Sequence, residues 1–303
     1  MWFFCFILSL ALAPMQIGVI NKVKAFFAGR RGPGVVQPYF DIAKLLKKGG
    51  AHSASGSVVL MAAPAAAFAA FVAAALFFPF GMAAAPFGFP GDVVLFFCLI
   101  GAGRLFMALG AFDTASAFEG MGATRELQFA AFAEAIVFVV AAFLALATKR
   151  LDLTGLLNGY DSKAWAGAGT SILLCAMAFY AALLAENCRA PFDDPDTHLE
   201  LTMIHEAMVL DYAGPDLALI QLGAAVKLWL FASFLTLMLA PFEAAAHPAA
   251  RAALYFGGVG AVSVAVGATE SAAARFRFLK LPQVFAGALA AALVAILLFA
   301  FKK

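Results

Sequence analysis

The sequence predicts an all-α integral membrane protein with eight transmembrane helices, a short interfacial helix and an ordered acidic cytoplasmic loop. Of its 303 residues, 64% are apolar and only 13% are charged, whereas soluble domains carry about a quarter charged residues. Uncharged stretches long enough to cross a bilayer recur along the whole chain, and the charged residues gather between them. We therefore treat residues 1–303 as a single membrane domain.

Eight apolar stretches approach the ~20 residues that a helix needs to span the hydrocarbon core. The first has no charged side chain and lacks the basic region and small-residue cleavage site of a signal peptide, so it is expected to be the first membrane helix. The expected spans are residues 1–21, 58–80, 93–112, 128–148, 164–185, 217–241, 252–269 and 281–301.

The basic residues between these spans predict the orientation. Twelve Lys and Arg residues fall on one side and six on the other, and the richer side faces the cytoplasm by the positive-inside rule. Both termini are then on the outer, periplasmic side of an inner (cytoplasmic) membrane. The twelve are Lys22, Lys24, Arg30, Arg31, Lys44, Lys47, Lys48, Arg125, Arg189, Arg275, Arg277 and Lys280. Loops at about 118–127 and 270–280 share this side with the acidic loop.

A Gly/Pro turn in the first cytoplasmic loop leads into a short amphipathic segment, at about residues 38–48. Its apolar side chains oppose charged ones, a pattern typical of a helix that lies in the membrane interface and is too short to span it. Asp41 and Lys44 on its polar face, with Arg275 and Arg277 in the last cytoplasmic loop, are candidates for docking a partner. A lipid anchor is the open alternative for the lysines of this segment.

The acidic cytoplasmic loop, at about residues 186–215, carries seven carboxylates against one guanidinium, although cytoplasmic loops are usually basic. Thr197 and Glu200 form a capping box that predicts a helix from His198 to Asp211. Leu201, Ile204, Met208 and Tyr212 fall on one face of that helix, which predicts docking on protein. The candidate coupling residues are Arg189, Asp193, Asp194, Asp196, His198, Glu200, His205, Glu206 and Asp211.

No metal or catalytic site is expected in this chain. His198 and His205 are seven residues apart, roughly 10 Å along a helix, too far to share one ion. Cys5, Cys98, Cys175 and Cys188 show no metal-ligand spacing, so no iron–sulfur cluster is expected here. The net charge of +2 is too small to indicate nucleic-acid binding.

Three charged residues fall within apolar spans: Arg104, Glu134 and Lys227. Helical rise places each roughly 12–17 Å below the cytoplasmic ends, so they could share one layer. A lone charge in lipid costs at least ~2.5–3.5 kcal/mol, so we expect Glu134 to pair with Arg104 or Lys227 on an ion path. A purely structural ion pair is the alternative. The residues expected to extend the path toward the cytoplasm are Asp113, Glu119, Arg125, Glu126, Glu186 and Glu270.

Two motifs carry a resemblance to a known family. At GPGVVQPYFDIAKLLKKG and ENCRAPFDDP the sequence resembles the subunit 1 family of respiratory complex I. The stretches GRLFMALGAFDTASAFEGMGATRE, THLELTMIHEAMVLDYAGP and ESAAARFRFLKLP resemble the branch found in energy-converting membrane-bound nickel–iron hydrogenases, namely formate hydrogenlyase subunit 4 and hydrogenase-4 component C. The resemblance covers nearly the whole chain.

The resemblance implies a non-catalytic subunit that anchors soluble hydrogenase large and small subunits and couples their electron transfer to antiporter-like membrane partners. The nickel–iron centre and iron–sulfur clusters would then belong to those partners. Arg189, Asp193 and Asp194 match the family's acidic loop, Asp41 and Lys44 its interfacial helix, and Glu134 and Glu186 its buried carboxylates.

Two other functions remain open from the sequence. One is the quinone-site membrane subunit of complex I, although the chain departs from that pattern after Asp194. The other is a secondary ion transporter, which should show inverted repeats and paired broken helices. Neither feature is evident in the sequence.

Overall fold

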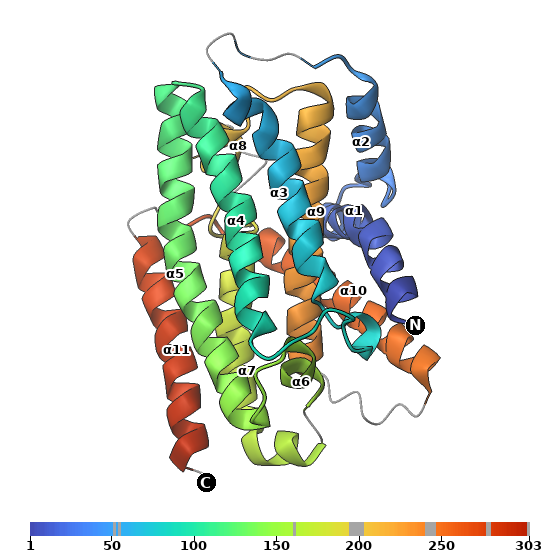
Figure 1. The fold of residues 1–303 in the computed structure, drawn as a ribbon, viewed down its shortest axis with the longest axis vertical. Coiled ribbons are helices and arrows are strands. Elements are labelled where there is room, and N and C mark those ends of the chain that lie inside the picture. Colours follow the sequence, from blue (N-terminus) through green and yellow to red (C-terminus); the bar gives the residue numbers. More distant parts are fainter. Residues whose placement is uncertain are drawn as a thin grey trace.

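The computed structural model describes residues 1–50, 53, 56–159, 162–193, 203–239, 247–276 and 280–301, with residues 162–164 and 166 described by their backbone alone. These residues form helices joined by turns and loops (Figure 1). The elements are α1 (Trp2–Phe27), α2 (Gln37–Lys47), α3 (Val58–Leu76), η1 (Phe80–Met82), α4 (Asp92–Asp113), α5 (Ala117–Thr148), α6 (Leu153–Asn158), α7 (Ser162–Glu186), α8 (His205–Met208), α9 (Gly214–Leu239), α10 (Pro248–Ala272) and α11 (Leu281–Phe301).

Within the described residues, eight helices are long and apolar enough to cross a membrane, which confirms the predicted fold class. One predicted boundary is wrong, because the loop expected at 118–127 forms the first turns of α5, a helix of 32 residues. Ser116 precedes this helix in an extended conformation and Glu119 occupies its first turn, where the helix dipole favours a carboxylate. Small residues in these first turns, Gly122 and Ala123, are buried against the rest of the protein.

Helix α9 lies at the centre of the bundle. Of the residues in its most apolar stretch, 83% are buried inside the protein, against 17% for α11. Figure 1 shows α9 behind α3, with α5 and α11 along one side and the inclined α1 and α10 on the other. The pairs α3–α4, α7–α11 and α1–α10 make the most extensive contacts. Both chain ends lie in the lower half of this view, away from α8.

The short amphipathic helix expected at 38–48 is present as α2. It packs against α1 and α9, with Ile42 buried at the contact. The Tyr39 hydroxyl donates a hydrogen bond to the Ala11 carbonyl of α1. Phe40 and Leu46 remain exposed on its outer side, so α2 is held by protein on one face and leaves apolar side chains on another.

The predicted helix from His198 to Asp211 is wrong over its described part, where only the single turn α8 is helical. The Asp193 carboxylate accepts a hydrogen bond from the His205 backbone N–H (3.3 Å), and Glu119 accepts one from that of Asp211 (3.1 Å). These side-chain anchors replace helical hydrogen bonds. The capping box and five site candidates lie outside the described residues: Asp194, Asp196, His198, Glu200 and Arg277.

The prediction that the apolar side chains of this segment pack against protein is nevertheless confirmed for its described residues. Ile204, Met208 and Tyr212 are all buried, and α8 packs against α5 and α4. Gly122 on α5 permits the close approach, because a Cβ there would lie 2.8 Å from the Ala207 Cβ and 2.9 Å from the Ile204 carbonyl oxygen. Docking of the acidic loop therefore depends on the absence of a side chain at this position.

Replacing Gly122 with alanine should destabilise the docked loop by about 1–3 kcal/mol, because the new methyl group meets a backbone atom that cannot rotate away. Gly120→Ala is the matched control, since its Cβ would meet only the Phe112 ring at 3.8 Å. Higher helix propensity should make that control neutral or more stable by up to about 1 kcal/mol. Thermal unfolding and limited proteolysis of the loop in detergent measure both effects. Equal behaviour of the two variants would contradict the close packing of α8 on α5.

Candidate functional site

A buried cluster of charges lies where α4, α5, α7 and α9 meet. Arg104 of α4 donates from Nη1 to both carboxylate oxygens of Glu186, each at 2.6 Å, and from Nη2 to Glu134 of α5. Lys227 of α9 completes the cluster, with its Nζ 3.8 Å from Glu186 Oε2. Arg104, Lys227 and Glu186 are buried, whereas the Glu134 side chain is 42% exposed.

The structure thus brings together the three charges that the sequence placed in one layer, and it adds Glu186, which pairs with both Arg104 and Lys227. Glu186, expected nearer the cytoplasm, is the last residue of α7. Arg104 precedes the end of α4 at Asp113 by nine residues, or roughly 13 Å. Helix α7 therefore ends well below the end of α4, and the acidic loop begins inside the bundle.

Glu126 and His205 extend the cluster toward the loop. Glu126 lies eight residues before Glu134 on α5, and its Oε2 is 3.2 Å from Nδ1 of His205 on α8. Three carboxylates, Glu126, Glu134 and Glu186, are then gathered around the two basic side chains Arg104 and Lys227. One more positive charge would neutralise the group, and a protonated His205 can supply it.

The surroundings of His205 favour that protonated form. Burial alone would lower the pKa of the imidazole, but the neighbouring Glu126 carboxylate outweighs burial and raises the pKa above its ordinary value. A histidine with this environment can accept and release a proton near neutral pH. His205 is therefore the candidate for a proton-exchanging group between the loop and the buried charges.

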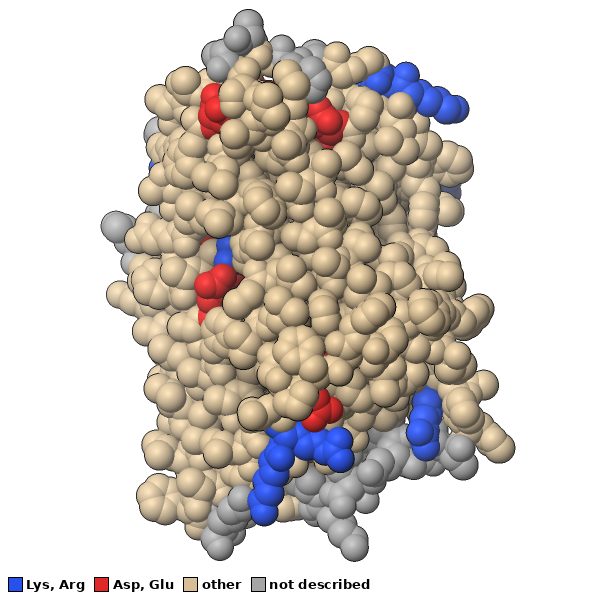
Figure 2. All heavy atoms as spheres, in the orientation of Figure 1, with Lys and Arg blue, Asp and Glu red and all other residues tan. Residues whose placement is uncertain are grey.

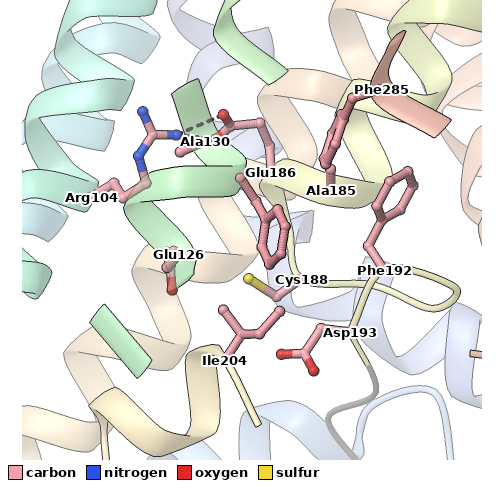
Figure 3. A pocket seen from close by; sticks show the side chains of 11 residues that line it. Arg104, Glu126, Ala130, Ala185, Glu186, Cys188, Phe192, Asp193, Ile204 and Phe285 are labelled. Atoms are coloured by element: carbon pink, nitrogen blue, oxygen red, sulfur yellow. Dashed lines mark hydrogen bonds and ion pairs between the residues drawn. The ribbon is translucent and has the colours of Figure 1, made fainter. Parts of the chain in front are cut away.

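Narrow cavities adjoin the charges, and two of them also touch residues of the acidic loop beyond Glu186. Figure 3 shows the first, lined by Arg104, Glu126, Glu186, Cys188 and Asp193 together with apolar side chains. The second lies between α3, α4 and α9 and is lined by Arg104, Glu126, His205 and Lys227. Each has room for about one or two water molecules. Such waters could relay protons among carboxylates and imidazole that do not touch directly.

Other predicted path residues hold the loop and the helix ends in place. Asp113 accepts hydrogen bonds from the Ser57 N–H (2.6 Å) and hydroxyl (2.9 Å) and so caps the start of α3. Arg125 donates to the Met203 carbonyl at 3.4 Å. Glu119, buried on α5, accepts a hydrogen bond from the Asp211 N–H. These contacts give the three residues anchoring positions around the charge cluster.

A second group of ion pairs fastens the loop to α1 and α10. Glu270 of α10 pairs with Lys24 of α1 (3.2 Å) and with Arg189 of the loop (3.5 Å). Arg275, considered for partner docking, pairs instead with Asp193 at 2.7 Å. The loop is thus bound on one side through Arg189 and Asp193, and on the other through His205.

The remaining candidates lie at or near the surface. Asp41 and Lys44 are exposed on α2, where Asp41 accepts a hydrogen bond from Gln37 at 2.9 Å. Glu206 is half-buried and Asp211 is exposed. Sequence reasoning missed Lys24, which was counted only for topology, and Cys188, which was judged by the spacing of cysteines alone. The cluster of polar residues around Cys188 in ENCR was the signal that could have drawn attention to it.

The fold and this cluster define a polytopic membrane protein with a buried charged centre next to an acidic loop that ion pairs hold in place. A family profile described as NADH dehydrogenase matches residues 1–300, and the chain belongs to this family. The match confirms the resemblance to the complex I subunit 1 family that the sequence motifs indicated.

Curated relatives point to two kinds of complex. The chain is 28% identical over 236 residues to hydrogenase-4 component C of Escherichia coli (strain K12), covering 78% of this chain and 73% of that protein. Formate hydrogenlyase subunit 4 of the same strain is 28% identical over 220 residues, with 72% and 69% covered. A subunit of the NADH-quinone oxidoreductase of Rubrobacter xylanophilus is 28% identical over 208 residues, with 66% and 62% covered.

A solved structure shares the fold. A chain of the membrane-bound sulfane sulfur reductase, described as an archaeal respiratory membrane complex, aligns with a TM-score of 0.85 at 18% sequence identity, covering 98% of each chain. At that identity the likeness concerns the fold alone.

The raised pKa of His205 predicts a pH-dependent stability. The protonated imidazole stabilises the folded chain fully below its ordinary pKa of 6.5, and this contribution is lost as pH rises through the raised value. The melting temperature of His205→Gln should therefore fall furthest below that of the wild type under acidic conditions, and the gap should narrow toward alkaline pH. Thermal unfolding in detergent across this range measures it, with the exposed His247→Gln as control. A gap that widens with pH would contradict the assignment.

Proposed function

We propose that this chain is the membrane-anchoring and coupling subunit of a formate hydrogenlyase-like, energy-converting hydrogenase complex. Its role is to link electron transfer in a soluble nickel–iron and iron–sulfur arm to the movement of protons or sodium ions. One observation carries the proposal: Glu186, which pairs with the buried cations Arg104 and Lys227, is also the residue at which α7 ends and the acidic loop begins. The similarity to hydrogenase-4 and formate hydrogenlyase subunits supports the choice of complex.

The contacts suggest how a change at the loop reaches the centre. A charge or conformational change in a docked soluble subunit acts on the loop, whose position is set by Arg189–Glu270, Asp193–Arg275 and His205–Glu126. Displacing His205 from Glu126 removes a positive charge from the group of three carboxylates. The buried centre is then left with an uncompensated negative charge, which favours uptake of a positive ion, so motion of the loop and ion uptake are linked.

A membrane partner is supported by the exposure of Glu134. The carboxylate is 42% exposed although it lies midway along α5. Figure 2 shows the middle of this side almost free of charge, apart from a small acidic and basic group at mid-height, while the other charged residues lie toward the two ends. An ionisable group facing lipid is costly, so we expect this face to be covered by an antiporter-like subunit that receives the charge. The soluble partners would be hydrogenase large and small subunits at the loop end.

A quinone-reducing complex is the second candidate, favoured by the similarity to a subunit of NADH-quinone oxidoreductase. In both cases we propose that the redox groups belong to partner subunits, and the ion path would use the same cluster. The two candidates differ in the chemistry of the soluble arm, which makes them separable by composition and activity.

The purified complex should contain nickel and should evolve or consume hydrogen without added quinone. Metal analysis and a hydrogen assay on one mild-detergent preparation, with its subunits identified, test this. An intact and active complex without nickel, whose turnover requires quinone, would assign the chain to the second candidate.

We further propose an inner-membrane location with both termini on the outer side, supported by the bias of basic residues and the even number of candidate spans in the described chain. A reporter fused after Lys303 should be active only outside the cytoplasm. Activity of a reporter that works only in the cytoplasm would reverse the orientation and the assignment of the acidic loop.

Glu134→Gln should uncouple the complex, because the amide can still accept a hydrogen bond from Arg104 but carries no titratable charge. We expect ion translocation per electron to fall by about tenfold or more while hydrogen turnover stays within about twofold. Asp152→Asn is a matched control that removes a carboxylate at the cap of α6, where asparagine also caps well. An unchanged ion-to-electron ratio in Glu134→Gln would leave Glu134 with a structural role only.

A further inference from the structure

Three side chains of different chemistry converge beside the charge cluster. Glu126 of α5, Cys188 of the acidic loop and His205 of α8 each offer one ligand atom, and these atoms all lie within 4.8 Å of one another. Within this group, Glu126 Oε2 and His205 Nδ1 are 3.2 Å apart. Figure 3 shows the Cys188 sulfur on the same side as the Glu126 carboxylate, at the edge of the first cavity.

These separations are close to those of a tetrahedral zinc site. Bond lengths of about 2.0 Å to nitrogen or oxygen and about 2.3 Å to sulfur place tetrahedral ligand atoms roughly 3.3–3.6 Å apart. The Glu126–His205 separation already has nearly this value. The thiol lies within 4.8 Å of both ligand atoms, so it needs to move by at most about 1.2 Å to match it. The adjoining cavity has room for about one water molecule, which could fill a fourth position.

Charge balance also suits a divalent cation. Glu126 and a Cys188 thiolate would supply two negative charges, and His205 would bind as the neutral imidazole. The filled site would therefore carry no net charge and would not repel the nearby Arg104 and Lys227. Burial raises the pKa of the Cys188 thiol when no metal is present, so binding would release its proton. The acidic groups that also act on the three ligands are Glu186, Asp193 and Glu206.

The backbone at Cys188 adds an independent indication. Cys188 has a φ of +49° directly beyond the end of α7, a position that favours glycine because a side chain there costs of order 1 kcal/mol. Its N–H bonds to the Ala185 carbonyl and the next N–H to that of Leu184, as at an ordinary helix end. The thiol thus stands at a strained backbone position, within 4.8 Å of a carboxylate oxygen and an imidazole nitrogen.

We propose that Glu126, Cys188 and His205 form a binding site for a zinc-class divalent cation that joins α5, the acidic loop and α8. Occupancy replaces the hydrogen bond between Glu126 and His205, so metal binding competes with protonation of the imidazole. Affinity should then increase with pH, and the bound metal should hold the loop against α5.

Cobalt(II) titration of the full-length chain in detergent tests the site, because a thiolate ligand gives cobalt a charge-transfer absorption in the near ultraviolet. We expect one Co²⁺ per chain, with this absorption, displaced by one Zn²⁺. Cys188→Gly should abolish the absorption and weaken binding by about 100-fold or more, since even outer-shell changes cost 10–100-fold. The same variant relieves the left-handed strain, so without metal it should melt at or above the wild-type temperature.

Controls separate this site from adventitious binding. Cys98→Ser removes an exposed cysteine of α4 and should leave stoichiometry and absorption unchanged, whereas His205→Gln should weaken binding as Cys188→Gly does. Cys188→Ser keeps a side chain at the position and provides a second folded variant without the thiolate. Absence of stoichiometric cobalt in the wild type, or equal binding by Cys188→Gly, would overturn the proposal.

Discussion

The burial of Arg104 is the constraint on which the centre of this molecule depends. A guanidinium cannot lose its proton in a protein, and removing one partner of a buried ion pair costs about 3–5 kcal/mol. Arg104 must therefore have carboxylates, and it receives them from two other helices, through Glu134 and Glu186. Because Glu186 ends α7, satisfying Arg104 also brings the start of the acidic loop into the bundle. Lys227 then adds a second cation to the same carboxylate.

The fold could be predicted because a bilayer makes length and apolarity nearly sufficient evidence for a helix. The eight spans and α2 follow from composition and periodicity. The extent of α5 did not follow from the sequence, because Arg125 and Glu126 suggested a loop. In the structure both residues are helical, and their side chains bond to Met203 and His205 of the acidic loop. The helix predicted through Asp211 failed for a related reason: carboxylates distant in sequence, Asp193 and Glu119, bind its backbone.

The charged layer was predictable from helical rise, whereas its central member was not. Depth along a helix can be counted for Arg104, Glu134 and Lys227, but the depth of Glu186 depends on how far α7 penetrates, which is a tertiary property. The same applies to Glu126, Cys188 and His205, which are separated by up to 79 residues and meet only because the loop folds back onto α5. Spacing rules for metal ligands detect neighbours in sequence and miss such long-range groups.

The early end of α7 has a consequence for the membrane potential. Because Glu186 ends α7 at the side chain of Arg104, nine residues before the end of α4, polar groups of the loop replace part of the hydrocarbon barrier on that side. The potential, worth about 2.3 kcal/mol per charge for 100 mV across the full membrane, then falls mainly across the remaining low-dielectric layer. In the proposed function, a proton passing from His205 toward Glu186 would move deeper into this field. If the proposed ion path holds, the buried ion pairs mark the depth at which charge movement would begin to do electrical work.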